Sequence, residues 1–301
     1  MTEMLQPQPA ESIYDPTCGS GGMLLSAITH LRRQNKEWRN VRLYGQERNL
    51  MTSSIARMNC FLHGIEDFRI ERGDTLSEPK LVEADRLMRF NVVLANPPYS
   101  IKQWDRVAFG SGPWGRNLYG TPPQGHADYA FWQHSIQSMA PKSGRCAILF
   151  QHGVLFRQEE AEMRRKLIEA DLIECVLGLG PNLFYNSPME ACVVICRSAK
   201  PTARRNKILF INAINEVTRE RAQGFSHRRS PGTHRQGLPG FQGRAGLCPR
   251  CHAGRPAHQG RQSEHPALCR PGDRSPPGPA RLCRRRRKRI GWRVRARYGR
   301  P

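Results

Sequence analysis

The segment from Ile13 to Leu24, IYDPTCGSGGML, constrains the fold more than any other part of the chain. A short apolar run, an acid, a glycine-rich turn and a second apolar run predict a β-strand that passes through a tight turn into an α-helix. Glycines let the backbone of such a turn approach a ligand closely, and the first amides of the helix are free to bind it. The segment therefore predicts a site for a nucleotide-like ligand.

The spacing of the glycines excludes two common nucleotide-binding motifs. Gly19, Gly21 and Gly22 do not form the dinucleotide-binding pattern G-x-G-x-x-G, and no Gly-Lys-Ser/Thr of a P-loop follows them. The meaning of the turn therefore depends on a second motif further along the chain, Asn96-Pro97-Pro98-Tyr99.

The positive charge of the chain is concentrated at its C-terminal end. Residues 227–301 contain 20 basic and two acidic residues, which supply +18 of the net charge of +23. The remaining charge on residues 1–226 is too small to indicate nucleic-acid binding by itself. No apolar run is long enough to span a membrane and no signal peptide is visible. We therefore expect no membrane partner, a cytoplasmic location and reduced cysteines.

Short apolar runs alternate with helical patterns over most of the chain. Strands are expected at 41–45, 68–71, 90–95, 146–151, 172–177, 192–197 and 208–212, besides the strand that ends at Asp15. Helices are expected at 22–33, 50–62, 128–139 and 161–170, and the second of these carries Met51, Ile55, Met58 and Leu62 at helical spacing. This alternation predicts an α/β fold with an open, mostly parallel, doubly wound sheet.

Four polar motifs follow expected strands, at the edge where such sheets bind ligands. They are Asp15–Gly22, Glu47, Asp74 and Asn96–Tyr99. A carboxylate at Glu47 can accept both hydroxyls of a ribose, and Asp74 can accept a hydrogen bond from an exocyclic amine. The alternative is that these acids, like Asp15, only cap a turn or a helix.

The tetrapeptide Asn96-Pro97-Pro98-Tyr99 suits the recognition of an NH₂ group. A proline disfavours the helical conformation of the residue before it, so Asn96 is expected to be extended. The Asn96 amide oxygen and the Pro97 carbonyl can then accept hydrogen bonds from one amine, while Tyr99 stacks on a planar ring. None of these groups is a good base, which predicts positioning and electrostatic stabilisation. A plain Pro-Pro turn is the alternative.

Together, Asp15–Gly22 and Asn96–Tyr99 resemble motifs of the S-adenosylmethionine-dependent N6-adenine DNA methyltransferases. More closely, the chain is similar to the modification subunit of type I restriction–modification systems. Three later segments carry the same resemblance, HADYAF at 126–131, HGVLFR at 152–157 and NLFY at 182–185. The resemblance extends over about residues 1–225, which we expect to form the catalytic domain.

The resemblance implies a class I S-adenosylmethionine-dependent methyltransferase fold, with S-adenosyl-L-methionine as the cofactor and no metal. The residues implied to bind the cofactor are Asp15, Thr17, Gly19, Ser20, Gly21, Gly22, Glu47 and Asp74. Those implied to hold a flipped-out target adenine are Asn96, Pro97, Pro98 and Tyr99, because an amino group inside the duplex stack is out of reach. The implied partners are double-stranded DNA, bordered by residues 100–127, a specificity subunit that reads the target sequence, and a restriction subunit.

The chain departs from the family pattern at both ends. In the family, a helical domain and an aromatic segment precede the cofactor turn, whereas Met1 stands 14 residues before Asp15 here. We therefore expect both to be missing and cofactor binding to be weakened. Residues 227–301 contain no asparagine and few apolar residues, which predicts a disordered Arg/Gly/Pro-rich tail over 226–301. The abrupt change suggests that the reading frame is lost between Ala222 and Arg228.

The tail also contains a metal-like pattern that we interpret as chance. Cys248-Pro249-Arg250-Cys251-His252 matches the haem-attachment motif C-x-x-C-H, and nearby Cys and His residues could suggest a zinc site. The run of basic residues at 284–289 would bind nucleic acid by charge alone.

Other functions stay open at this point. The tetrapeptide suits any NH₂ group on a planar system, so the acceptor could be RNA, the N4 of cytosine or a protein glutamine. The long aromatic loop at 101–127 and the segments after Asp128 favour DNA. The chain could instead be an inactive, truncated gene product that binds nucleic acid unspecifically through its tail.

Overall fold

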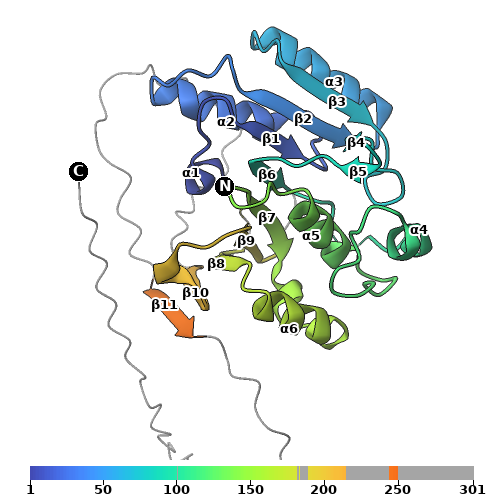
Figure 1. The fold of residues 1–301 in the computed structure, drawn as a ribbon, viewed down its shortest axis with the longest axis vertical. Coiled ribbons are helices and arrows are strands. Elements are labelled where there is room, and N and C mark those ends of the chain that lie inside the picture. Colours follow the sequence, from blue (N-terminus) through green and yellow to red (C-terminus); the bar gives the residue numbers. More distant parts are fainter. Residues whose placement is uncertain (100, 182, 184–188, 215–243, 250–301) are drawn as a thin grey trace, which may run out of the picture. The chain divides into compact units, whose positions relative to one another are not determined.

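A central sheet organises the structure (Figure 1). A computed structural model describes residues 1–99, 101–181, 183, 189–214 and 244–249, all within the first of two compact units, Met1–Arg250. Nine strands of this part of the chain form the sheet. From one edge to the other they are β3 (Phe68–Arg72), β2 (Arg42–Glu47), β1 (Ser12–Asp15), β6 (Val92–Ala95), β7 (Arg145–Gln151), β9 (Ala191–Arg197), β8 (Ile173–Leu179), β10 (Lys207–Ala213) and β11 (Arg244–Pro249).

The sheet is mostly parallel. The five strands β3, β2, β1, β6 and β7 are parallel to one another, and β10 is parallel to β8. β9 runs antiparallel to both β7 and β8 because it follows β8 without a described crossover helix. β11 pairs antiparallel with β10, within the segment 226–301 that the composition assigns to a tail. The rest of that segment lies outside the described residues.

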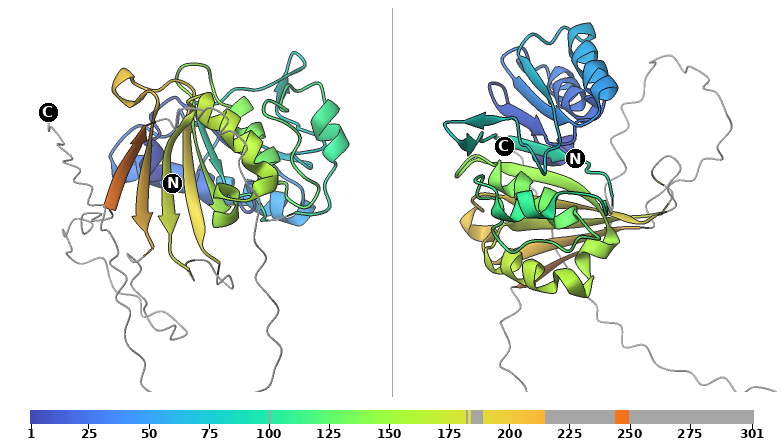
Figure 2. Two further views of the ribbon diagram at one scale, coloured as in Figure 1. Left: turned by 90° about the horizontal axis from the view of Figure 1, so that it is seen from below. Right: turned by 90° about the vertical axis from the view of Figure 1, so that its right-hand side faces the viewer.

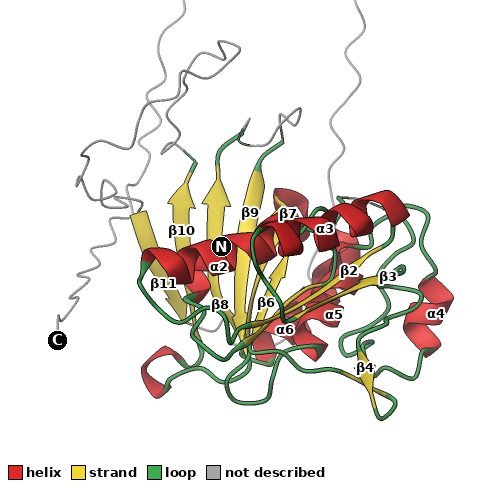
Figure 3. Ribbon diagram, turned by 90° about the horizontal axis from the view of Figure 1, so that it is seen from above, coloured by secondary structure: helices red, strands yellow, loops and turns green. Residues whose placement is uncertain are grey.

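Helices cover both faces of the sheet (Figures 2 and 3). The α-helices of the described chain are α1 (Thr2–Leu5), α2 (Gly22–Arg33), α3 (Leu50–Leu62), α4 (Arg106–Ser111), α5 (Asp128–Gln137) and α6 (Ala161–Glu169). Short 3₁₀ helices occupy η1 (His152–Leu155), η2 (Gln158–Glu160) and η3 (Thr202–Arg204), and a small hairpin joins β4 (Val82–Glu83) to β5 (Arg86–Leu87).

The alternation of side chains along the strands explains the two covered faces. Ile13 and Val92 lie in one buried cluster with residues of α2 and α3, whereas their neighbours Tyr14 and Val93 lie in another with residues of α5 and α6. Successive side chains of a strand point to opposite faces, so the central strands β1 and β6 are buried on both sides. The predicted open, mostly parallel, doubly wound sheet is therefore confirmed.

Helix α3 presents its apolar residues in an unexpected direction. The spacing predicts the helix with its observed bounds, but Met51, Ile55, Met58 and Leu62 are all exposed. Its buried face consists of the small residues Ser53, Ala56 and Cys60. The reason is close packing against the glycine turn, because a Cβ added to Gly21 would lie 3.6 Å from the Cβ of Ala56.

Six cysteines before the C-terminal tail are buried and free of disulfides. They are Cys18, Cys60, Cys146, Cys175, Cys192 and Cys196. Burial raises the pKa of the Cys18 and Cys60 thiols above the ordinary value, which keeps them protonated. No helix in the described ranges is long and apolar enough to cross a membrane.

Candidate functional site

A cavity of about 1060 Å³ opens at the carboxyl ends of β1, β2, β3 and β6. Its volume is at the upper end of the range for ligand sites, roughly 300–1,000 Å³. We call one side the polar wall, which is formed by the following residues: Pro16, Thr17, Gln46, Glu47, Arg48, Asn49, Arg72, Gly73, Asp74 and Thr75. We call the other side the aromatic wall, which is formed by the following residues: Asn96, Pro98, Ile101, Gln103, Trp104 and Phe131. The remaining lining residues are Leu50, Met51, Ser54 and Leu76.

The glycine turn lies against the end of β2. Gly19 and Gly21 have φ angles of +54° and +83°, a region that residues with a side chain adopt only at a cost. The Cys18 amide donates to the Gln46 carbonyl at 3.0 Å, which holds the turn on the neighbouring strand. Gly45 permits this approach, since a Cβ there would lie 2.9 Å from the Cys18 Sγ.

Three predicted carboxylates are anchored by backbone amides. Asp15 accepts from the Thr17 amide at 2.9 Å, and Asp74 accepts from the Leu76 amide at 2.9 Å. Glu47 accepts from Gly19 at 3.0 Å and from Asn49 at 2.8 Å, one amide to each oxygen. The capping role that the sequence left open is therefore present. Glu47 and Asp74 also line the cavity, so the two roles coexist.

Asp15 lies beneath the cavity rather than on its surface. The side chain is 1 % exposed, and burial raises its pKa to about 7, with the charge of Glu47 adding to the rise and the Thr17 amide opposing it. Its second oxygen, Oδ2, and the Thr17 hydroxyl are buried without a hydrogen-bond partner in the described structure. Buried polar atoms without partners are rare in folded proteins, which makes this pair of oxygens a notable feature beside the cavity.

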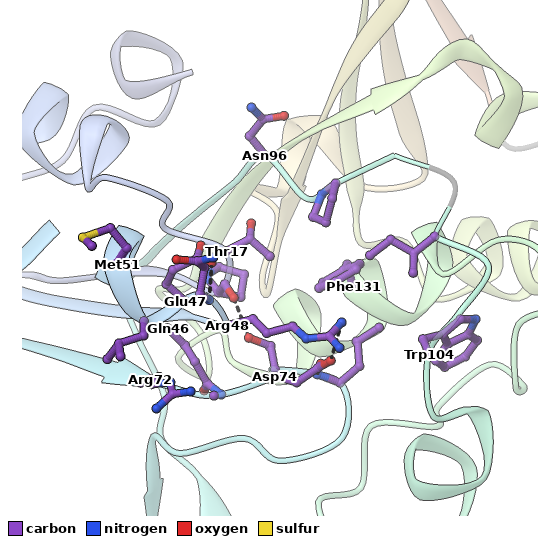
Figure 4. Close-up of a pocket in the computed structure, with 18 of the residues that line it drawn as sticks. Thr17, Gln46, Glu47, Arg48, Met51, Arg72, Asp74, Asn96, Trp104 and Phe131 are labelled. Atoms are coloured by element: carbon purple, nitrogen blue, oxygen red, sulfur yellow. Dashed lines mark hydrogen bonds and ion pairs between the residues drawn. The ribbon is translucent and has the colours of Figure 1, made fainter. Parts of the chain in front are cut away.

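The tetrapeptide Asn96-Pro97-Pro98-Tyr99 forms the rim of the aromatic wall. Asn96 is exposed and follows β6 directly, and its side chain points away from Glu47 and Asp74 (Figure 4). Its Oδ1 accepts a long hydrogen bond of 3.3 Å from the Tyr99 hydroxyl. Burial raises the pKa of Tyr99 to about 12, with smaller contributions from Cys192 and Asp128, so the hydroxyl stays a donor at neutral pH.

Not all the predicted site residues face the cavity. Thr17, Glu47, Asp74, Asn96 and Pro98 line it, while Ser20, Gly21 and Gly22 do not. Gly22 instead lines a smaller groove between α1 and α2, with Thr2 and Ser26. Gly19 reaches the site only through Glu47, and Pro97 and Tyr99 lie behind Asn96 and Pro98.

Sequence reasoning missed several side chains of the cavity. Arg48 forms an ion pair of 3.5 Å with Asp74 across the polar wall (Figure 4). Met51 and Phe131 bring apolar surface from α3 and α5, and Trp104 comes from the loop at 101–127. The aromatic content of that loop was the available signal for Trp104, whereas Phe131 sits in a segment noted only for its family resemblance.

Two later segments join below the aromatic wall. Arg157, from HGVLFR, donates to Asp128 of HADYAF at 2.5 Å and to Glu160 at 2.8 Å. Both carboxylates are buried, so the arginine supplies the charge that their burial requires. NLFY at 182–185 lies outside the described residues except for Leu183, and of the tail pattern CPRCH only Cys248 and Pro249 fall within β11.

The strand order and the cavity at the carboxyl edge define a class I S-adenosylmethionine-dependent methyltransferase fold. The chain belongs to the N-6 DNA Methylase family, whose sequence model matches residues 1–229.

Proteins of type I restriction systems are among the similar sequences and structures. The chain is 35% identical over 216 residues to the HindI methylase subunit of Haemophilus influenzae, which covers 71% of this chain and 46% of that protein. It is 33% identical over 222 residues to the MjaVII methylase subunit of Methanocaldococcus jannaschii, covering 71% and 37%. A solved type I methyltransferase subunit from Streptococcus thermophilus matches with 32% identity and a TM-score of 0.66, covering 73% and 47%. The chain thus spans less than half the length of these relatives.

Proposed function

We propose that this chain carries the methyltransferase domain of a type I modification subunit, which methylates the N6 amino group of adenine in DNA. The observation that carries the proposal is one cavity bounded by the carboxylates of the polar wall and by the Asn96 tetrapeptide. Family membership supports the reaction class, and the similar type I methylase subunits support the setting.

The residues of the polar wall fit S-adenosyl-L-methionine, which supplies the transferable methyl group. Glu47 retains lone pairs toward the cavity after accepting two backbone amides, and these suit the hydroxyls of a ribose. Asp74 offers an acceptor for an adenine amine. Thr17 lines the cavity directly above the buried Asp15 carboxylate, whose charge suits the cationic methionine end. Gly19, Ser20, Gly21 and Gly22 contribute by letting the turn approach the ligand.

The aromatic wall fits a flipped-out base. Asn96 and the Pro97 carbonyl would hold the amino group, and Pro98, Tyr99 and Phe131 offer flat surfaces for the ring. Holding the amine with two acceptors draws its nitrogen toward tetrahedral geometry and frees the lone pair for attack. The residues act by orientation and electrostatics, which in comparable sites are worth roughly 10²–10³ in rate.

We propose double-stranded DNA as the substrate, a specificity subunit as the source of target recognition, and a restriction subunit as a further member of the complex. A cytoplasmic location follows from this role. Residues 100–127, of which Ile101, Gln103 and Trp104 line the cavity, would border the DNA.

We also propose that the methyltransferase domain ends near residue 225 and that the following segment is out of frame. The family match ends at residue 229, close to the change in composition, and β11 (Arg244–Pro249) is the only element that the structure describes after it. Resequencing the gene across the codons for 222–228 tests this, and an intact frame there would refute it.

The function is tested by methylation of plasmid DNA with radiolabelled S-adenosylmethionine, alone and with a cognate specificity subunit, followed by base analysis. Label in N6-methyladenine is the expected result. Label in cytosine, in RNA or only in protein would show a different acceptor. Titration calorimetry with the cofactor separates an inactive chain, which gives no heat at millimolar concentration, from an active one that lacks its specificity subunit.

A further inference from the structure

Arg116 is a buried cation that the proposed chemistry does not use. It belongs to the long loop at 101–127, yet it is only 1 % exposed. Its guanidinium makes its hydrogen bonds outside this loop, donating to the carbonyls of Thr75 at 2.7 Å and Leu76 at 2.8 Å. Within the described residues no carboxylate forms an ion pair with it, although arginine is rarely buried without one.

Of the two carbonyls that Arg116 binds, that of Thr75 belongs to the polar wall and that of Leu76 to another residue that lines the cavity. The Thr75 hydroxyl donates to the Pro16 carbonyl at 2.5 Å, next to the glycine turn. The Leu76 amide donates to the Asp74 carboxylate at 2.9 Å. Pro16, Asp74, Thr75 and Leu76 all line the cavity. Through Thr75, Arg116 is therefore linked to Pro16 beside the glycine turn, and through Leu76 it is linked to Asp74.

The loop that carries Arg116 is held in place by several contacts with α4 and α5. Its guanidinium lies 5.0 Å from the centre of the Phe109 ring in α4. The loop is held to α5 by Gln133, which accepts from the Tyr119 amide at 2.7 Å and donates to the Gly120 carbonyl at 2.9 Å. Trp104 of the aromatic wall donates to the Gln124 carbonyl at 3.0 Å in the same loop. A shift at Arg116 would therefore move the loop rather than one side chain.

The surroundings of Arg116 oppose a purely stabilising role. Burial lowers its pKa to about 10, and its Nε has no partner in the described structure. The facing groups are Tyr14, His134 and Asp74, and burial keeps the first two neutral by raising the pKa of Tyr14 and lowering that of His134. A charge that is desolvated without a counter-ion is expensive, and the two carbonyl partners satisfy only part of the hydrogen-bonding capacity of the guanidinium.

We propose that Arg116 is a positioning residue that links the polar wall to the loop at 101–127. The inference rests on the proposed function, because it requires the polar wall to bind the cofactor. Filling the cofactor site fixes Thr75 and Leu76, and Arg116 passes this constraint to the loop that carries Trp104. Cofactor and acceptor binding are then coupled, each favouring the other by the same factor.

Hydrogen exchange of the full chain with and without S-adenosylmethionine tests the link. In the unmodified chain, cofactor should slow exchange in residues 101–127 by about fivefold, because the loop opens less often. Arg116→Met should weaken cofactor binding about tenfold and abolish this protection even at saturating cofactor. Arg116→Lys retains one donor group and should restore part of the protection. The matched control is Arg106→Met, since among the described residues the Arg106 side chain donates to the Pro122 carbonyl inside the same loop and does not reach the polar wall.

The outcomes separate the two proposals. Absence of cofactor binding in the unmodified chain would refute the proposed function and the inference with it. Cofactor binding without protection of the loop would refute only the link. Protection that persists in Arg116→Met would also refute the link. If Arg116→Met fails to fold, Arg116→Lys decides, since full protection in that variant at unchanged affinity would show that the two-carbonyl contact is dispensable.

Discussion

The two walls of the cavity are built in different ways. In the polar wall, Glu47 accepts hydrogen bonds from the backbone amides of Gly19 and Asn49, and Asp74 accepts one from the amide of Leu76. All these donors lie close to the ends of strands. In the aromatic wall, Trp104 and Phe131 belong to a small apolar cluster with Phe109, and the exposed Asn96 has one long hydrogen bond. The comparison shows that the polar wall is held by a set of backbone hydrogen bonds, whereas the rim of the aromatic wall at Asn96 is held much more lightly.

The largest expected effect is on methyl transfer, and it distinguishes the aromatic wall from the polar wall, which is expected to affect cofactor binding. Asn96→Ala should lower the rate of methyl transfer by about 10²–10³-fold, because it removes an acceptor that acts on the reacting amine. The cofactor dissociation constant should change less than about twofold, since the proposed cofactor site is the other wall. Calorimetry and single-turnover methylation measure the two quantities. Asn117→Ala is the control, because Asn117 bonds only to Gly110 and Thr121 in the adjoining loop. Equal losses in both quantities would break the comparison.

Substitution in the turn should act on cofactor binding. Gly21→Asp should weaken cofactor binding by at least about 100-fold, since the residue has a φ of +83° and gains a charge next to two acids. Gly64→Asp is the matched control, because Gly64 also has a positive φ, of +67°, but does not line the cavity. Calorimetry gives the affinities, and circular dichroism confirms folding of both variants. Unchanged binding by a folded Gly21→Asp chain would place the cofactor elsewhere.

The hydrogen bonding of the polar wall is tested at Glu47. Glu47→Gln preserves the shape but turns an NH₂ group toward one of the two backbone amides, which should weaken cofactor binding about tenfold. Glu71→Gln, on the neighbouring strand, should have no effect because Glu71 pairs only with Arg69 at the surface. Similar affinities for the two variants would mean that neither the cap nor the charge of Glu47 supports cofactor binding.

The smallest expected effect is a pH dependence that arises at Asp15. With a pKa of about 7, Asp15 is largely neutral in slightly acidic solution, and a cationic ligand would favour its ionised form. Cofactor affinity should therefore fall about fourfold from about pH 8 to about pH 6.5. Asp15→Asn should bind more weakly and show no such change in calorimetry. A steeper or reversed profile in the unmodified chain would exclude Asp15 as its source.

The same pKa shift has the opposite sign for folding without ligand. The folded pKa of Asp15 lies above its ordinary value of 3.8, so the unfolded chain releases this proton first as the pH rises. This group therefore lowers stability progressively between about pH 4 and pH 7. The cofactor would offset the loss, which ties the stability of the polar wall to its occupancy.

Local patterns predicted the scaffold and the polar wall well. α2 and α3 have the expected bounds, and Glu47 and Asp74 meet in one cavity as their positions after strands imply. These features depend on residues near one another in sequence or on the common edge of parallel strands. The roles of the predicted cofactor and acceptor residues stay predictions until they are tested.

Long-range packing set the limits of prediction. Nothing local to Arg116 shows that its guanidinium crosses to Thr75, because the contact depends on the path of the whole loop. The expected loop at 101–127 also contains α4, whose first turn is capped by Asp105. In α3 the apolar spacing identified the helix but not its orientation, because the close approach of the glycine turn requires the small face of the helix.

The rate at which a buried thiol is alkylated can report how often the glycine turn opens. Thiolates, not thiols, react with alkylating reagents, so a sulfur that is both covered and held protonated is nearly inert in the native chain. Cys18 lies within the glycine turn, against the position of Gly45, and can be labelled only when the turn leaves the end of β2. Its labelling rate therefore reports how often the turn opens, and cofactor that binds there should slow it while leaving a distant thiol such as Cys175 unchanged.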